Sequence, residues 1–526
     1  MAFFFLVAVL AASLSSAAGQ KRPIVHFKGT SAAELNQVIA NAADHSIIQL
    51  APKTYVFDQS IVIARSHITL TGHGRDKTRL LFRMAEQDAG DFIHIIGGHK
   101  QRIGRLTQSA DQSTPILKLA PGHRLATGDV VYLSRPNSAA FLKRHNWQGL
   151  DAKKTQRRPL REAIASVARS GMLSAELAND LPAEFPKRIS TVHKIHAVRQ
   201  VTVSDLSIQF DGDRPNPYAF TNTIPDVVSA AAIRLTRTVD SRVERVNITN
   251  TISKGIALDS SLRTVVKSVR INGSHNKGIR GEGYGIELRE TFDSQLSDLT
   301  LFNTRHAVLF SSWHMEAGNR VHIRRTNRDV NFHGGLDHSN EVVIDEMVLD
   351  YDMRQRNGRP KHAWSAITKG GRNHPNTNFF ASNVITMNSV TSSWRNDILI
   401  AGNEGSALNS ADGYDVLIGG RGSDVVSGGR QSDIYLLGEG HDTITDFEPG
   451  AHGDTIWVPF SFSELTKHAA QDNRGLVIKW RDDFSVSLRG VELAQLHPNN
   501  IQRCTHDCKQ RILARRYRLE PGVPRF

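Results

Sequence analysis

Short apolar runs that alternate with polar residues make up much of the N-terminal half of the chain. A period of two residues is typical of strands with one buried face. Pro52, Gly72 and Gly74 interrupt the first runs, which favours strands over helices in that region. A short helix is expected ahead of these strands, at 33–43. The pattern therefore predicts a chain built almost entirely of β-strands.

The strands from residue 201 onward recur at a regular interval. The first buried apolar residues of successive units are Ile233, Ile256, Ile286, Val308 and Val330, which are 23, 30, 22 and 22 residues apart. An insertion at 275–282 accounts for the longer interval. A period of this length, with two or three short strands per unit, predicts a parallel β-helix, which we place at 23–391. Leucine-rich repeats share the length, but their L-x-x-L-x-L-x-x-N signature is absent.

A basic stretch interrupts the strands before the regular units begin. Residues 141–173 carry eight lysines and arginines against two acidic residues. The segments 159–173 and 174–180 have a helical pattern. We therefore expect a basic, partly helical insertion near 141–190, beside the β-helix.

A nine-residue unit repeats six times between Ser392 and Thr445. Glycines permit its tight turn, an aspartate at its sixth position offers a hard oxygen ligand, and an apolar eighth residue fills the interior. Ser406 replaces the aspartate in the second unit. The register predicts a parallel β-roll with its cap at 392–500, holding roughly one to three calcium ions. A metal-free Gly/Asp-rich linker is the alternative, although linkers show no such register. The residues expected to hold calcium are Asp415, Asp424, Asp433, Asp442, Gly420, Gly422 and Gly429.

The unit at Gly419–Ser427, GGRGSDVVS, resembles the GGxGxDxUx repeats of RTX proteins. The resemblance implies Ca²⁺ as a cofactor and, because millimolar calcium lies outside the cytoplasm, export. Residues 1–18 fit a signal peptide with an apolar run at Phe3–Ala12, although no lysine or arginine precedes it. A membrane anchor is the alternative, but the run is too short to span a bilayer comfortably. We expect a secreted, extracellular protein without stable membrane insertion. A periplasmic or cell-surface location is the alternative.

Lysine and arginine outnumber acidic residues by 65 to 52, which gives a net charge of +13. Such a field concentrates polyanions, and for an exported protein we expect an anionic polysaccharide as partner. A merely solvated basic face is the alternative. Nucleic acid is not expected, because helix-turn-helix and finger spacings are absent. We expect the protein to be a monomer. The basic tail, 501–526, holds Cys504 and Cys508 at the spacing of a local disulfide, without further metal ligands.

Strand alternation places Glu287 and Arg289 on the outer face of one coil and Asn331 and His333 on the outer face of the coil two further along. Arg289 and His333 lie two coils apart, about 10 Å, with Ser311 between them, which suits a sugar ring across the face. A zinc site is the competing interpretation of the nearby histidines, but their spacing does not fit H-x-x-x-H on a helix. The other polar residues expected around this face are Tyr284, His306, His314, Arg324, Arg325, Arg328, Asp337 and His338.

β-Elimination from a uronic acid needs a group that neutralises the carboxylate, a base for the C5 proton and an acid for the departing O4. Arg289, Glu287 and Asn331 suit the first task, His333 or His306 the second, and Tyr284 the third. Hydrolysis would instead need two opposed carboxylates. Glu287 with Asp259 or Asp337 is conceivable, but the surrounding excess of cations favours elimination.

The octapeptide Gly283–Glu290, GYGIELRE, is similar to GYGFDPHE of the mannuronan C5-epimerases. A β-helix followed by RTX repeats also resembles these enzymes and related alginate lyases, which have the right-handed parallel β-helix of the pectate-lyase-like superfamily. The resemblance implies Tyr284 as the catalytic tyrosine, Glu287 as the acidic residue and Lys254 as an assisting lysine. Arg289 stands where the family has a catalytic histidine, which removes an easily titrated base.

We therefore expect a secreted lyase that cleaves a uronic-acid polymer, alginate-like or polyglucuronate-like. A C5-epimerase is the second interpretation, and a non-catalytic calcium-dependent polysaccharide-binding protein or adhesin is the third. The expected catalytic residues are Tyr284, Arg289, His333, Glu287 and His306. The expected substrate-binding residues are Asn331, Arg328, His314, His338, Asp337 and Lys254.

Overall fold

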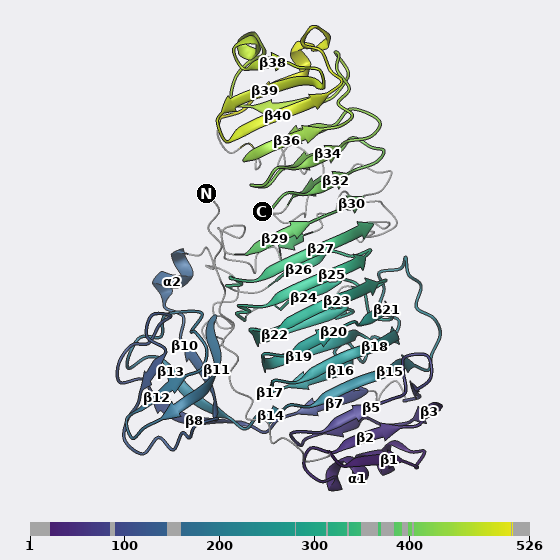
Figure 1. The fold of residues 1–526 in the computed structure, drawn as a ribbon, viewed down its shortest axis with the longest axis vertical. Helices are drawn as coiled ribbons and strands as arrows, with labels where there is room; N and C mark the ends of the chain where they lie inside the picture. Colours follow the sequence, from purple (N-terminus) through teal and green to yellow (C-terminus); the bar gives the residue numbers. More distant parts are fainter. Residues whose placement is uncertain are drawn as a thin grey trace.

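The chain forms a long column of stacked coils, and the insertion forms a small separate sheet at its side (Figure 1). The computed structural model describes residues 22–84, 90–144, 159–278, 280–311, 314–333, 336–348, 367–369, 383–391, 398–401, 404–505 and 508. The predicted signal peptide lies outside the described residues, as does most of the basic tail. No helix within the described ranges is both long and apolar enough to cross a membrane.

The predicted coil register is confirmed strand by strand. Ile233 pairs with Ile256, Ile256 with Ile286, Ile286 with Val308, and Val308 with Val330, all in parallel. These side chains are fully buried, so identical positions of successive coils stack in the interior. They belong to one sheet, here called the short sheet. In the described residues it contains β4 (Ile61–Ile63), β7 (Ile93–Ile96), β14 (Val198–Arg199), β16 (Ala231–Thr236), β17 (Thr238–Val239), β19 (Lys254–Leu262), β22 (Ile286–Phe292), β24 (Val308–Phe310), β26 (Val330–Phe332) and β28 (Ile367–Lys369).

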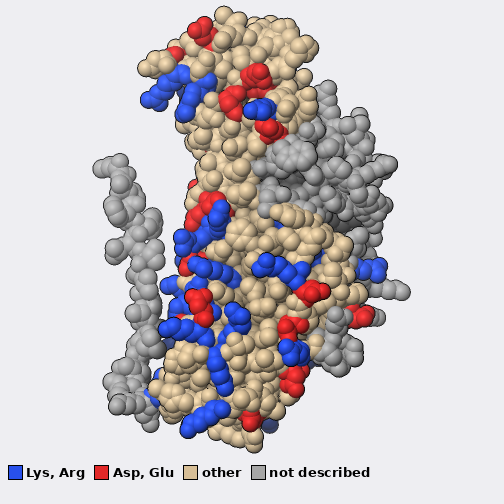
Figure 2. Space-filling model, turned by 90° about the vertical axis from the view of Figure 1, so that its right-hand side faces the viewer, with Lys and Arg blue, Asp and Glu red and all other residues tan. Residues whose placement is uncertain are grey.

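A second sheet, here called the long sheet, runs the whole length of the column. Its strands pair in parallel until the C-terminal hairpin, and one hydrophobic core extends from Phe27 to Ile501. Side-on, lysines and arginines are densest over the β-helix part of the column (Figure 2). The long sheet contains β1 (Ile24–Phe27), β2 (Ile47–Leu50), β3 (Thr54–Phe57), β5 (Thr69–Thr71), β6 (Arg79–Phe82), β15 (Thr202–Phe210), β18 (Arg242–Thr251), β20 (Val265–Lys267), β21 (Arg270–Ser274), β23 (Gln295–Phe302), β25 (Arg320–Thr326), β27 (Glu341–Val348), β29 (Val384–Met387), β30 (Val390–Thr391), β32 (Ala407–Asn409), β34 (Val425–Ser427), β36 (Gly440–Ile444), β38 (Ala469–Gln471), β39 (Gly475–Arg481) and β40 (Phe484–Arg489).

The predicted helix at the N-terminal end is confirmed as α1 (Ala32–Asn41). Ser31 caps it, because its hydroxyl accepts from the Glu34 amide while the Glu34 carboxylate accepts from the Ser31 amide. The buried face of α1 carries Leu35 and Ile39, which belong to the hydrophobic core of the column. The helix therefore protects the first coils from solvent.

The insertion is an antiparallel sheet, and the helices predicted at 159–173 and 174–180 are wrong. β11 covers most of the first segment, and Arg161–Val167 are all buried because both faces of this strand are packed. One face contacts the insertion's own core and the other contacts residues of the β-helix such as Phe292 and Met315. The strands are β8 (Lys100–Arg105), β9 (Ile116–Lys118), β10 (Val130–Arg135), β11 (Arg161–Ser170), β12 (Ser174–Leu177) and β13 (Thr191–Ile195), with the single turn of helix α2 at Ala139–Arg144.

The β-roll continues the column without a break in the long sheet, because β30 pairs with β32 and β32 with β34. Its opposite side is a separate parallel sheet of β31 (Ile398–Ile400), β33 (Val416–Ile418), β35 (Ile434–Leu436), β37 (Thr455–Val458) and β41 (Ile501–Arg503). Short 3₁₀-helices at Phe462–Lys467, Leu493–Gln495 and Pro498–Asn500 complete the cap.

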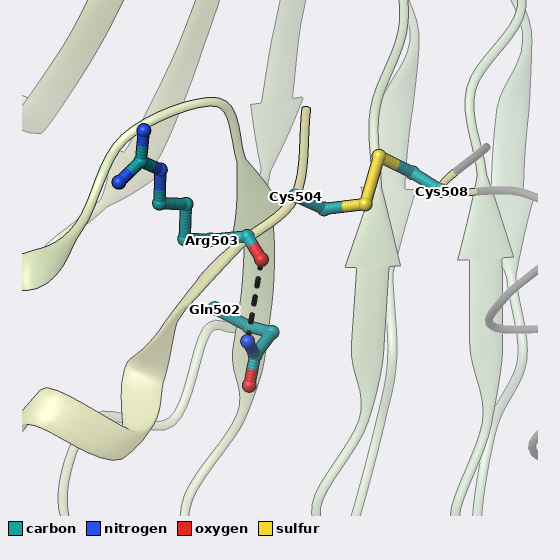
Figure 3. Close-up of a disulfide and its surroundings, with 4 residues drawn as sticks. All are labelled: Gln502, Arg503, Cys504 and Cys508. Atoms are coloured by element: carbon teal, nitrogen blue, oxygen red, sulfur yellow. Dashed lines mark hydrogen bonds between the residues drawn. A yellow bond between two sulfur atoms is a disulfide. The ribbon is translucent and has the colours of Figure 1, made fainter. Parts of the chain in front are cut away.

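The predicted disulfide between Cys504 and Cys508 is present beside the last strand (Figure 3). The Cys504 amide donates to the Val458 carbonyl, 2.8 Å away, and its side chain packs on Trp457 and Val416. The disulfide therefore fastens the end of the described chain to the outer face of the roll.

Candidate functional site

An open cleft of about 350 Å³ lies on the outer face of the short sheet, over β16, β19 and β22. Three cations and three carboxylates line it, and they come from segments up to 198 residues apart in sequence, Asp91 to Arg289. The parallel stacking of coils brings them together. These charged residues are Asp91, Arg234, Lys254, Asp259, Glu282 and Arg289.

Glu287 is the buried centre of the charges on β19 and β22. Its carboxylate receives Lys254 Nζ at 2.5 Å and Arg289 Nη2 at 3.0 Å, and the Ser311 hydroxyl donates to it at 3.0 Å. Burial alone would raise the pKa of Glu287, but the charges of Lys254 and Arg289 outweigh it and lower the pKa to about 2. Glu287 is therefore an anion that positions two cations.

Lys254 and Arg289 differ in what they expose to the cleft. The Lys254 side chain is 3% exposed and also pairs with Glu282, at 2.7 Å. The Arg289 side chain is 36% exposed, and its Nε donates to Ser311. Arg289 Nη1 donates no hydrogen bond to any described residue. Arg289 therefore presents one face of its guanidinium to the cleft.

A second ion-pair chain borders this one, and the sequence analysis missed most of it. Arg234 Nε lies 2.8 Å from Asp91 Oδ2, and its Nη1 lies 2.6 Å from Asp259 Oδ2. Asp91 precedes β7, in a coil that the insertion separates from the regular units after residue 201, so the sequence period does not reveal its place in the cleft. The run at 92–96 was the available signal, since Ile93 and Ile95 stack on Ile233 and Leu235.

Tyr284 and His306 form a stacked pair beside the cleft, with ring centroids 5.7 Å apart. His306 Nδ1 bonds to Asp329 Oδ1 at 2.8 Å, which leaves Nε2 available to accept a proton. Burial raises the pKa of Tyr284 to about 12. The charges of Glu287 and Glu282 also raise it, and the charge of Arg305 lowers it. The phenol therefore stays protonated near neutral pH and can act as a proton donor.

The predicted outer rows are confirmed in their register. The Ser311 amide donates to Leu288 and the His333 amide to Phe310, so Arg289, Ser311 and His333 follow one another on consecutive coils. Asn331 continues the row of Glu287 and Leu309, but it is only 8% exposed.

Arg328 is placed differently from the prediction, because it lies in the interior and is 1% exposed. Its guanidinium donates to the carbonyls of Thr304 and Pro217, at 2.8 and 2.9 Å. Arg324 and Arg325 lie on β25 in the long sheet, where they pair with Asp298 and Glu346. The chain turns a corner between β24 and β25, so outward positions there face another side of the column.

His314, Asp337 and His338 lie at the junction between the β-helix and the insertion, away from the cleft lining. His314 Nδ1 lies 3.2 Å from Glu162 and 3.4 Å from Glu290. Burial lowers the pKa of His314, but its hydrogen bond with Glu162 and the charges of Glu162 and Glu290 together outweigh this and raise the pKa. His338 bonds the carbonyls of Leu336 and Pro182, and Asp337 is fully buried.

The junction cluster of Glu162, Glu290 and His314 has ligand atoms close enough to hold a metal ion. The chain already compensates its charge, however. Lys100 Nζ lies 2.5 Å from Glu290 Oε2, and the Tyr132 hydroxyl donates to Glu162. These contacts fasten the insertion to the column without any metal.

The roll offers a different kind of site, built from buried aspartates. The Asp433 carboxylate accepts from the Asp415 amide through Oδ1, and Asp442 accepts from the Asp424 amide, both at 2.8 Å. The Oδ2 atoms of Asp433 and Asp442 are buried and accept no hydrogen bond from the described residues. Burial raises the pKa of Asp433 to about 8 and that of Asp442 to about 7.

These orphaned oxygens fit the hard ligands that calcium requires. Glycine is needed around them: a Cβ on Gly428 would lie 2.1 Å from Asp433 Oδ2. The predicted glycines are equally confined, since Gly429 has φ +90° and a Cβ on Gly422 would lie 2.2 Å from the Gly405 nitrogen. Gly420 donates its amide to Asp424 Oδ2 at 3.1 Å. A cation at these turns would supply the charge that the chain lacks.

Residues 411–444 match the family described as RTX calcium-binding nonapeptide repeat (4 copies), which implies calcium binding by this segment. No curated protein sequence matches the chain. Among solved structures, the chain is similar to the tailspike gp61 of Pseudomonas phage phi297, with 11% identity and a TM-score of 0.40 over 81% of this chain and 72% of that one. It is also similar to an alginate lyase from Paenibacillus sp. strain FPU-7, with 9% identity and a TM-score of 0.33 over 82% and 95%. Such values bear on neither substrate nor reaction.

Proposed function

We propose that this protein is an exported, calcium-dependent enzyme that cleaves a uronic-acid polymer by β-elimination at the cleft of the short sheet. The observation that carries the proposal is a set of three polar groups without partners among the described residues. These are Arg289 Nη1, His306 Nε2 and the Tyr284 hydroxyl, gathered around β22 and its neighbouring coils. Polar groups that converge on a cleft without a protein partner are free to bind a ligand there.

Each group has a task in the elimination. Arg289 binds the uronate carboxylate, which lets the negative charge at C5 delocalise onto it. His306, oriented by Asp329, takes the C5 proton through Nε2. The electron pair of the C5–H bond forms the C4–C5 double bond, the bond from C4 to O4 breaks, and Tyr284 donates its proton to O4. His333, two coils from Arg289 in the same row, would bind the neighbouring sugar.

Glycoside hydrolysis fits the cleft less well. A hydrolase needs a carboxylic acid that is protonated at working pH. The pKa of Glu287, lowered to about 2, removes it from that role. Asp259 is held in ion pairs with Arg234 and Arg289, and Asp337 lies at the junction.

A C5-epimerase is the second candidate, and the position of Lys254 favours it. The epimerase resemblance implied an assisting lysine, and Lys254 lies 2.5 Å from Glu287, beside Tyr284. The two reactions share the loss of the C5 proton and differ in whether O4 leaves. Proton exchange at C5 without chain cleavage would identify the epimerase.

The test is ultraviolet absorbance of the unsaturated product after incubation, in calcium, with alginate, polyglucuronate and pectate. We expect absorbance with at least one polymer and a loss of roughly 100-fold or more in Tyr284→Phe, because general acid catalysis contributes on that scale. Tyr414→Phe, an exposed tyrosine in the roll, is the matched control and should retain full activity. Retention of the polymers with neither product nor exchange would contradict an enzyme and leave a binding protein.

A further inference from the structure

A second depression, here called the long-sheet groove, lies over β6, β15, β18 and β21 and belongs to a different sheet from the cleft. Its volume is about 500 Å³. Its floor consists of outward polar side chains of these strands, and its walls are the turn at Arg75 and the loop from Arg214 to Pro217. None of the residues that line it lines the cleft.

The floor is a polar ladder in register with the coils. Arg79, Ser207 and Asn247 occupy the same position on successive strands, and the row continues to Arg270, which does not line the groove. A parallel row consists of Gln209, Thr249 and Asn272. The coils rise by about 4.8 Å each, which is close to the length of one pyranose residue in an extended polysaccharide. Amides and hydroxyls at that interval can bind the hydroxyls of successive sugars.

The arginines that line the groove are not held in ion pairs. Arg75, Arg79 and Arg214 of the lining form no ion pair with any described residue, and Asp76 is the single acidic residue of the lining. Burial lowers the pKa of Arg75 and the nearby charge of Arg270 lowers it further, while the charges of Asp298 and Asp205 oppose the shift. In the cleft, by contrast, Arg234, Lys254 and Arg289 are all paired with carboxylates. Unpaired guanidinium groups beside amides favour an anionic ligand.

The wall of the groove is fixed before any ligand binds. Lys277 Nζ donates to the Asn216 carbonyl at 2.7 Å, and Arg328 Nη2 donates to the Pro217 carbonyl at 2.9 Å. The Arg328 guanidinium also lies over the Phe220 ring. A preformed wall lowers the entropic cost of binding. Arg328, expected to touch substrate at the cleft, instead positions this loop.

We propose that the long-sheet groove is a second, non-catalytic binding site for an anionic polysaccharide. Its arginines bind carboxylate or sulfate groups, and its amide ladder binds the sugar hydroxyls. The proposal holds whether or not the cleft is catalytic, because the two sites share no residue. A chain held in the groove would keep the protein on an anionic matrix while another segment occupies the cleft.

The test is calorimetric titration, in calcium and low salt, of the full chain with a mannuronate hexamer. The background variant Tyr284→Phe/Arg289→Gln disables the cleft so that binding reports the groove. We expect Arg79→Ala/Arg214→Ala in that background to weaken binding roughly tenfold or more, as the loss of hydrogen bonds to charged groups predicts. Arg489→Ala, an exposed arginine of the cap, is the matched control and should change nothing. Neutral maltohexaose should not bind.

Two results would overturn the proposal. One is unchanged hexamer binding by the double variant, with unaltered melting temperature. The other is arginine-dependent binding of a short DNA duplex without binding of the hexamer, which would assign the groove to nucleic acid. Failure of the cleft is read separately, from the absence of unsaturated product with the unmodified protein.

Discussion

Buried carboxylates occur both in the cleft and in the roll, and the two regions compensate their charge in opposite ways. Glu287 lies between Lys254 and Arg289, and its pKa falls to about 2. Asp433 is buried too, but it has only a backbone amide on one oxygen, and its pKa rises to about 8. The same burial thus gives a stable anion in one place and a destabilised one in the other.

The difference shows in which part of the column the chain's own cations balance the buried carboxylates. Within the β-helix the chain supplies every counter-charge of the cleft, so the site is complete without an added cation. Within the roll the chain supplies oxygens without paired cations, so we expect calcium to stabilise the folded roll. Because the long sheet is continuous through β30 and β32, the end of the β-helix depends on the roll for cover.

Removal of calcium should have the largest effect and should separate the two regions. We expect excess chelator to destabilise the roll much more than the β-helix, because each site loses about 3 kcal/mol of binding free energy relative to a hundredfold excess of calcium over its Kd. Calorimetry should show the roll's transition move down by more than that of the β-helix. Magnesium should not restore it, since Mg²⁺ demands a smaller octahedral site. A roll transition that ignores chelator would contradict the comparison.

Replacing Lys254 by methionine should leave a buried carboxylate of the cleft without its main counter-charge, as the aspartates of the roll are without calcium. The change leaves Glu287 buried with one cation fewer, which we expect to destabilise the β-helix by about 3 kcal/mol or more. Urea unfolding measures the loss, and it should be independent of chelator. Lys267→Met, an exposed lysine of β20, is the matched control. In the double variant Lys254→Met/Glu287→Gln part of the stability should return, and simple additivity of the two changes would refute the coupling.

The two regions should also respond to pH with opposite signs. Asp433 and Asp442 have folded pKa values raised to about 8 and about 7, so in chelator the folded roll binds protons more tightly than the unfolded chain. Its stability is then greatest below their ordinary pKa and falls by about 1.4 kcal/mol per pH unit for each group until the folded pKa of that group is reached, about 7 for Asp442 and about 8 for Asp433. Glu287 has a depressed pKa, so its contribution is present above the ordinary value and is lost as pH falls through about 2. Chelated melting curves from pH 5 to 8 measure the first effect, and calcium should abolish it.

The stacking of the column could be read from the sequence because it is periodic. Ile233, Ile256 and Ile286 occupy one interior row, as their spacing predicted. The outward neighbours Glu287 and Arg289 followed from alternation alone. The register of the aspartates in the roll was equally visible, since each turn repeats the same local geometry.

What the sequence could not show depends on partners distant along the chain. The segment at Arg161–Ser170 is rich in alanine and resembles a helix, but β10 and β12 pair with it on both edges. Arg328 is of a residue type that often binds anionic ligands. Its guanidinium instead donates to the carbonyl of Pro217, 111 residues earlier, and this contact fixes its direction. Asp91 lines the cleft from a coil that precedes the insertion in sequence.

Ser406 provides the subtlest test, because it is the one described repeat position where the roll lacks its aspartate. Its amide donates to Asp424 Oδ1 at 2.8 Å, and its side chain is buried, so it occupies the same place as the aspartates. Ser406→Asp adds a carboxylate that should stabilise the roll in calcium and destabilise it in chelator, by about 1 kcal/mol in each direction. Ser406→Asn has the same size without the charge and should show no reversal. If both variants shift the melting temperature alike in the two conditions, the cost at this position is steric, and compensation by calcium does not explain the buried aspartates.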